Sequence, residues 1–104
     1  MLIENPATTV FVSAASAWEV STKVRLGKLP EAEMLCDRFH DIVTRLRAET
    51  LAITATHALL AGRMVWDHRD PFDRMLAAQA MVDDLTLVTR DRALRDLAGL
   101  STIW

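Results

Sequence analysis

Apolar and polar residues alternate along the chain in blocks that predict short strands separated by amphipathic helices. Residues 9–12 are β-branched or aromatic, and they predict a strand that stops at Ser13, a good helix N-cap. A helix is then expected over residues 13–26, because Gly27 and Pro30 follow it as stop signals. The first part of the chain therefore predicts one strand followed by one helix.

Residues 31–48 carry apolar side chains at steps of three and four, which predicts one amphipathic helix or two abutting ones. From residue 49 to the end, the pattern again predicts strands that are followed by helices, and then one last strand. Thr54 is a candidate N-cap, and Asp70 with Pro71 forms a second helix start, Asp70 as N-cap and proline at the first helical position. We expect strands at 51–53, 86–89 and 102–104, and helices at 55–63, 71–82 and 93–97.

Strands that alternate with helices predict βαβ units, and hence an α/β fold in which a mostly parallel sheet is flanked by helices. The length of 104 residues fits one domain, and we expect it to span residues 1–104. Ligands of open α/β sheets gather beyond the carboxyl ends of the strands. The residues that follow each predicted strand are therefore the first place to look for chemistry.

Composition narrows the possible functions. Lys and Arg number 12 against 14 Asp and Glu, so the formal net charge of -2 provides no strong global attraction to nucleic acid or membrane. A single cysteine, Cys36, excludes an internal disulfide framework and fits a reducing compartment such as the cytoplasm. No apolar run approaches the roughly 20 residues of a membrane span, and the three glycines are too far apart for a nucleotide-binding loop.

Three carboxylates occupy comparable places in this scheme. Glu19 lies early in the first helix, Asp73 in the first turn of a later one, and Asp91 just past the strand at 86–89. If they converge, their oxygens suit a hard divalent cation such as Mg²⁺ or Mn²⁺ and metal-assisted cleavage of a phosphodiester.

Each acid also has a purely structural interpretation. Glu19 can pair with Lys23 one helical turn later, Asp73 can interact with free N–H groups at its helix start, and Asp91 can act as an N-cap. Spacing alone does not decide between these interpretations and a shared cation.

Arginines flank two of these acids and could hold the phosphates of an RNA strand, although charge balance explains them equally well. They are Arg69, Arg74, Arg90 and Arg92. The three histidines show no metal-binding spacing, and core or solvent positions are expected for them. Cys36 is expected to be a small buried residue, and Trp18 and Trp66 to be core or interface residues.

Three segments in a fixed order make the chain recognisable: residues 10–20 with the letters VFVS to WEV, residues 68–80 with HRDPFDR to AAQA, and residues 87–91 with LVTRD. Together they resemble the PIN-domain family, and within it the VapC-type toxins of bacterial type II toxin-antitoxin modules. The resemblance covers residues 9–104.

This resemblance implies a PIN-like α/β fold and a metal-dependent endoribonuclease in which Glu19, Asp73 and Asp91 match the acidic positions. Thr89 matches a polar position beside the last acid. The resemblance also implies Mg²⁺ or Mn²⁺, an RNA substrate, a homodimer, and an antitoxin that inserts into or covers the site.

One departure from the family pattern concerns the start of the chain. Family members open with an apolar strand that ends in an Asp, and this unit supplies the first metal-binding acid and the central strand of the sheet. Residues 1–6 resemble instead the end of the following helix and the approach to the second strand, and Glu4 is not expected at a strand end. We therefore expect an N-terminally truncated chain or a misassigned start. A chain that lacks this strand should have reduced activity, or alternatively be a remnant that serves for dimerisation or antitoxin binding.

Overall fold

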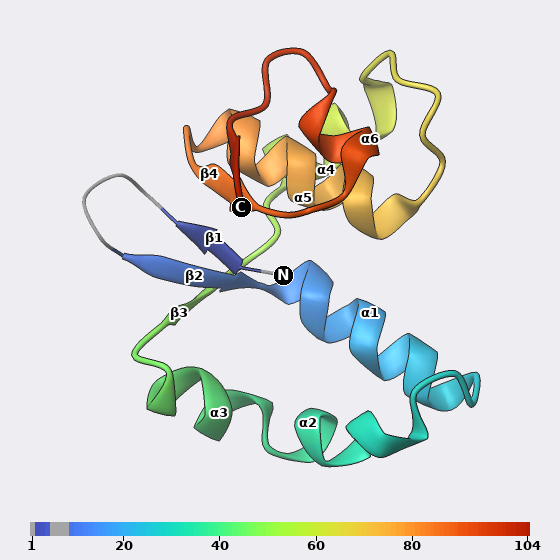
Figure 1. The fold of residues 1–104 in the computed structure, drawn as a ribbon, viewed down its shortest axis with the longest axis vertical. Coiled ribbons are helices and arrows are strands. Elements are labelled where there is room, and N and C mark those ends of the chain that lie inside the picture. Colours follow the sequence, from blue (N-terminus) through green and yellow to red (C-terminus); the bar gives the residue numbers. More distant parts are fainter. Residues whose placement is uncertain (1, 5–8) are drawn as a thin grey trace.

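The computed structural model describes residues 2–4 and 9–104, and its centre is one five-stranded sheet of order β3-β2-β1-β4-β5 (Figure 1). β2 runs parallel to β3, and β4 runs parallel to β5. The predicted α/β fold, with parallel strands flanked by helices, is confirmed. The strands are β1 (Leu2–Glu4), β2 (Val10–Ser13), β3 (Glu49–Leu51), β4 (Thr86–Val88) and β5 (Thr102–Ile103).

β1 occupies the centre of the sheet and runs antiparallel to both of its neighbours, so the sheet is mixed. Ile3 pairs with Phe11 on one side and with Leu87 on the other, and its side chain is fully buried. The central strand that family members form at their start was expected to be missing, and residues 2–4 occupy the central position instead. Residues 1, 5 and 6, which belong to the same opening segment, lie outside the described residues. In this position β1 pairs with backbone N–H and C=O groups of β2 and β4 that would otherwise lack partners. Only five residues separate β1 from β2, which is too short for the crossover that parallel strands need, so the two strands run antiparallel.

The helices begin and end close to the predicted positions, and each long one begins at a capping side chain. Ser13, Thr54 and Asp70 accept hydrogen bonds from backbone N–H groups at the starts of α1, α4 and α5. These caps explain why the sequence patterns located the helix starts well. The helices are α1 (Ala14–Arg25), the short 3-10 helix η1 (Pro30–Ala32), α2 (Glu33–Asp37), α3 (Phe39–Arg45), α4 (Ala55–Arg63), α5 (Pro71–Val82) and α6 (Arg92–Arg95).

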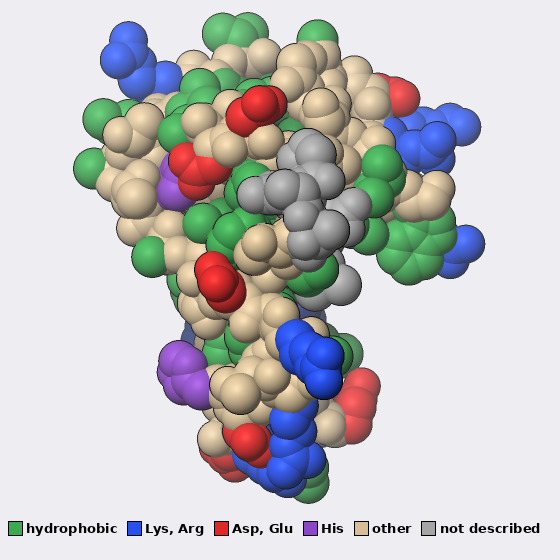
Figure 2. All heavy atoms as spheres, turned by 90° about the vertical axis from the view of Figure 1, so that its left-hand side faces the viewer, with side chains coloured by type: hydrophobic (Ala, Val, Ile, Leu, Met, Phe, Trp, Pro, Cys, Tyr) green, Lys and Arg blue, Asp and Glu red, His purple; other side chains and the backbone are tan. Residues whose placement is uncertain are grey.

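The segment predicted as one or two helices over residues 31–48 is divided into three pieces, η1, α2 and α3. Arg38 separates α2 from α3 with φ -118° and ψ 22°, outside the helical region. This arm lies apart from the upper lobe of the fold, and viewed from the side it is a narrow part of the molecule that bears side chains of both charges (Figures 1 and 2). Met34 and Leu35 on it are 66% and 41% exposed, so its apolar face is only partly covered.

α5 packs against the sheet and contributes Leu76, Ala77 and Ala80 to the core. A buried serine at the end of β2 and a buried glutamine on α5 form a polar link through this core: the Ser13 hydroxyl donates to Gln79 Oε1, and Gln79 Nε2 donates to the carbonyl of Ala52. The link fixes α5 relative to β2 and to the start of α4. The buried core residues are Ile3, Ala15, Leu76, Ala77, Ala80, Leu85, Leu87 and Leu94.

His57 is a core histidine, as expected. Its Nδ1 accepts a hydrogen bond from the N–H of Thr54, so its Nε2 must carry the proton that faces Asp83 Oδ2 at 2.9 Å. The ring therefore joins the start of α4 to the end of α5. No helix in the described ranges 2–4 and 9–104 is long and apolar enough to cross a membrane.

Arg74 holds the connection between α4 and α5. Its guanidinium donates four hydrogen bonds to backbone carbonyls and lies 5.9 Å from the centroid of the Trp66 ring. The accepting carbonyls belong to Ala61, Met64, Trp66 and His68. Because the connection has no regular structure of its own, one arginine supplies donors that a helix or sheet would otherwise provide.

Replacing Arg74 by Met should lower the free energy of unfolding by about 3 kcal/mol, because four carbonyls lose a charged donor at once. Chemical denaturation followed by circular dichroism measures the change. Arg63→Met is the matched control, since Arg63 is an exposed arginine at the end of α4, and we expect its effect to stay within about 0.5 kcal/mol. Equal stabilities of the two variants would contradict this role of Arg74.

Candidate active site

Asp73 is a buried carboxylate in the first turn of α5, with a residue exposure of 8%. It does not cap its own helix, because Asp70 Oδ1 already accepts from the N–H groups of Phe72 and Asp73 at 2.9 and 3.3 Å. The Asp73 side chain is instead 2.8 Å from His68 Nε2 through Oδ2. Asp70 thus takes the capping role, and Asp73 remains available for another one.

The pKa of Asp73 is raised above its usual value, first because burial disfavours the charged form. The hydrogen bond and charge of His68 oppose this rise, whereas the negative charges of Asp70 and Asp91 add to the rise in pKa. Asp91 therefore lies within electrostatic range of Asp73.

Glu19 lies on α1, whose middle contacts the first turn of α5. The contact is made by the adjacent Trp18, which packs edge-to-face on Phe72 at 4.5 Å between ring centroids. Glu19 Oε2 accepts a hydrogen bond from Lys23 Nζ at 3.0 Å, which confirms the predicted pairing one turn apart. Its side chain is 21% exposed.

Lys23 connects Glu19 electrostatically to the acids of α5. The pKa of Lys23 is raised, chiefly by its hydrogen bond to Glu19, against a smaller lowering by burial. The charges of Glu19, Asp70 and Asp73 raise this pKa further. The ammonium group therefore lies in the field of acids from two helices.

Asp91 follows β4 and caps α6, where its Oδ1 accepts from the N–H of Ala93 at 2.9 Å. Its own N–H donates to Thr89 Oγ1 at 3.0 Å. Thr89 is 3% exposed and is the residue after β4, so its hydroxyl fixes the turn that carries Asp91. Asp91 therefore caps α6 as expected, and it does so with Oδ1, so Oδ2 is not used in the cap.

The donor chemistry of Glu19, Asp73 and Asp91 fits a hard divalent cation, because all three are carboxylates and one of them is buried. The geometry is not that of an assembled metal site: across residues 2–4 and 9–104, no three His, Cys, Asp or Glu side chains are arranged to hold one ion. Glu19 is held by Lys23 instead. In the structure Glu19, Asp73 and Asp91 are therefore not closed around a common point.

The predicted phosphate-binding arginines have different surroundings. Arg74 points inward to the backbone carbonyls described above, so its guanidinium is committed within the protein. Arg90 is exposed beside the acidic region, with its guanidinium 4.8 Å from the centroid of the Trp104 ring. Arg92 is exposed at the start of α6, and Arg69 is exposed just before α5.

His68 is a site residue that the sequence pattern did not single out. Its ring packs at 4.7 Å between centroids against Trp66, while Arg74 binds its carbonyl at 3.0 Å. These contacts aim Nε2 at Asp73. The only sequence feature that could have indicated His68 is its position shortly before α5, a helix capped by Asp70 and carrying Asp73 in its first turn. No regular spacing predicts that a histidine at this position contacts Asp73.

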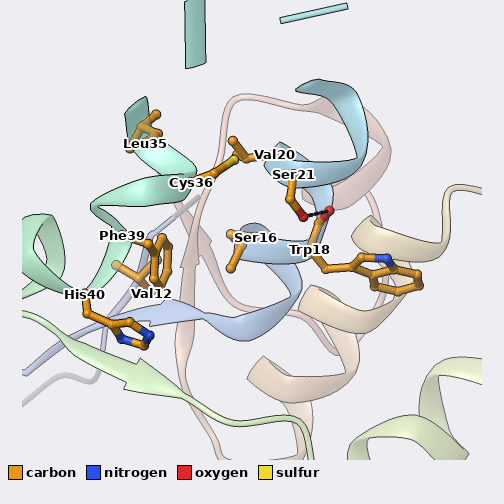
Figure 3. A pocket seen from close by; sticks show the side chains of 10 residues that line it. Val12, Ser16, Trp18, Val20, Ser21, Leu35, Cys36, Phe39 and His40 are labelled. Atoms are coloured by element: carbon orange, nitrogen blue, oxygen red, sulfur yellow. Dashed lines mark hydrogen bonds between the residues drawn. The ribbon is translucent and has the colours of Figure 1, made fainter. Parts of the chain in front are cut away.

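An apolar hollow of about 490 Å³ lies on the other side of α1, between that helix and the α2–α3 arm (Figure 3). Val20 of α1 faces Leu35 and Cys36 of α2 across it, and Phe39 lies beside Val12. The acidic residues do not line this hollow. Cys36 lies there among apolar neighbours, as expected, but it is half-buried rather than buried, because the hollow beside it stays open.

The sequence matches the PIN domain family over residues 2–100. It is also 32% identical over 56 residues to Ribonuclease VapC16 of Mycobacterium tuberculosis (strain ATCC 25618 / H37Rv), an alignment that covers 54% of this chain. The aligned part spans 40% of that relative. Both findings support the VapC-type resemblance that the sequence motifs carry. Because the family match extends over nearly the whole chain, the chain belongs to the PIN domain family.

Proposed function

We propose that this protein is a metal-dependent endoribonuclease, the toxin of a toxin-antitoxin module, and that it acts in the cytoplasm as one PIN-like domain. The observation that carries the proposal is the buried Asp73 carboxylate, which no cap or ion pair with a Lys or Arg explains and which lies in the field of Asp91. The relative named Ribonuclease VapC16 supports the reaction class.

In this proposal Glu19, Asp73 and Asp91 hold Mg²⁺ or Mn²⁺ and are the catalytic residues. The bound ion supplies an activated water and neutralises charge that builds on the scissile phosphate. His68 orients the Asp73 carboxylate through Nε2, and Asp70 keeps the N–H groups of the first turn occupied. The protein thus contributes an acidic position that is fixed before substrate arrives.

RNA binding is assigned to residues around Asp91. Arg90 and Arg92 are exposed on either side of it, and both guanidiniums can reach the phosphates of a strand that crosses the acids. Thr89 accepts from the Asp91 N–H and is 3% exposed, so we assign it to positioning the substrate-binding turn rather than to direct contact with RNA. We assign Arg74 to positioning, because its donors face the α4–α5 connection.

A second candidate function rests on the apolar hollow beside α1. The hollow and the exposed Met34 and Leu35 offer surface for apolar side chains of a partner, either an antitoxin helix or a second copy of the chain. In that case the protein is a dimerisation or antitoxin-binding module with impaired catalysis.

Titration calorimetry with Mn²⁺, run beside a cleavage assay on single-stranded RNA, separates the two candidate functions. We expect wild-type protein to bind Mn²⁺ and to cleave, and Asp73→Asn to lose more than about tenfold in Mn²⁺ affinity because a buried ligand loses its charge. Asp67→Asn, an exposed aspartate before α5, is the control and should behave as wild type. Metal uptake without RNA cleavage would favour the binding module.

Asp91→Asn tests whether Asp91 is more than a helix cap. Asparagine caps helices about as well as aspartate, so the free energy of unfolding should stay within about 0.5 kcal/mol of the wild-type value. Cleavage of single-stranded RNA should nevertheless fall by about tenfold or more, since a neutral amide is a weaker ligand for a hard cation. Unchanged cleavage by a stable Asp91→Asn protein would reduce Asp91 to its capping role.

Replacing Arg90 and Arg92 together by Ala should weaken binding of a single-stranded RNA, measured in EDTA so that cleavage does not interfere. The slope of log affinity against log salt should become shallower by about 1.4 if both contact phosphates of single-stranded RNA. Arg45→Ala, an exposed arginine on the distant α3, serves as the control. Equal salt slopes for the double variant and the control would exclude this phosphate contact.

A further inference from the structure

The ammonium of Lys23 holds one of the proposed metal ligands, Glu19, within α1. It donates to Glu19 Oε2 at 3.0 Å, and the charges of Asp70 and Asp73 act on it as well. The Trp18–Phe72 contact holds the two helices together at this level. Lys23 is therefore more than one half of a surface ion pair within α1.

We propose that the Lys23 ammonium is a built-in counter-ion of the acidic site, which holds Glu19 away from coordination until a divalent cation displaces it. The inference rests on the proposed function, because it concerns the same metal ligands. It accounts for the disagreement between a carboxylate set that suits a metal and a geometry in which those carboxylates do not surround one point.

Electrostatics explains why the two cations exclude each other. A divalent ion bound by Glu19 would share a carboxylate with the ammonium at hydrogen-bonding distance, and like charges that close repel strongly when partly shielded from water. Removing the ammonium also leaves the acids with a more negative potential. Both effects act in the same direction, so loss of the Lys23 charge should tighten metal binding.

The side chain of Lys23 is able to leave without any change in the fold. It lies on the surface of α1 with a side-chain exposure of 42%, and its four-carbon stem is flexible. A rotation about its own bonds carries the ammonium into solvent. The exchange of one cation for another then requires only side-chain movement.

Other basic residues near the end of α1 provide matched controls. Arg25 and Lys28 are exposed and lie beyond Lys23 towards the turn after the helix. Lys28 is connected to Lys23 only through its backbone N–H, which donates to the Lys23 carbonyl at 2.9 Å. A substitution of Lys28 changes the net charge by the same amount and leaves the Lys23–Glu19 hydrogen bond in place.

The test compares Lys23→Met, Lys23→Arg and Lys28→Met with wild type in calorimetric titrations with Mn²⁺. Methionine keeps length and helix propensity and removes the charge. We expect Mn²⁺ affinity to rise by about tenfold or more in Lys23→Met, from the removed repulsion between the two cations. Lys23→Arg and Lys28→Met should both stay within about twofold of wild type.

Thermal unfolding provides a second measurement that needs no activity. In EDTA, Lys23→Met should melt below Lys28→Met, because its acids lack their counter-ion. With saturating Mn²⁺ this difference should vanish or reverse.

Three outcomes decide the inference. Tighter Mn²⁺ binding by Lys23→Met supports it, even if wild type binds too weakly to measure. Equal or weaker binding by a folded Lys23→Met, when wild type binds, overturns this inference and leaves the proposed function intact. Absence of Mn²⁺ binding in both proteins overturns the inference and the metal-dependent function together.

Discussion

Burial of the Asp73 carboxylate at the start of α5 is the constraint on which the arrangement of its neighbours depends. Burial and the neighbouring charges of Asp70 and Asp91 both disfavour ionised Asp73. His68 and Lys23 supply the opposing polar and positive groups, one from the α4–α5 connection and one from α1. The protein thereby keeps a buried carboxylate folded at this helix start.

The remaining architecture serves to aim these groups. Asp70 caps α5, so Asp73 in the first turn of that helix is free to face His68. Arg74, the following residue, turns the other way and binds the backbone of the connection that carries His68. Asp70, Phe72 and Arg74 thus perform capping, packing and support at one helix start. The sequence segment HRDPFDR contains these three residues together with His68 and Asp73.

Local patterns predicted the helix starts because the caps are local interactions. Thr54, Asp70 and Asp91 each bond to N–H groups within three residues, which a sequence reading can recognise. The pairing of Glu19 with Lys23 is equally local and was also predicted. The split of the arm at Arg38 and the inward turn of Arg74 depend on tertiary packing, so propensity and charge patterns did not reveal them. The antiparallel β1 could not be predicted from three residues, since its direction follows from the neighbours it pairs with.

The central claim is that Glu19, Asp73 and Asp91 share one divalent cation. Anomalous diffraction from crystals soaked in Mn²⁺ tests it most directly, because the anomalous signal locates manganese independently of its ligands. The account predicts a peak bound by Asp73 and Asp91, with Glu19 turned from Lys23 towards the ion. Manganese only at unrelated surface carboxylates, with Glu19 still on Lys23, would contradict it.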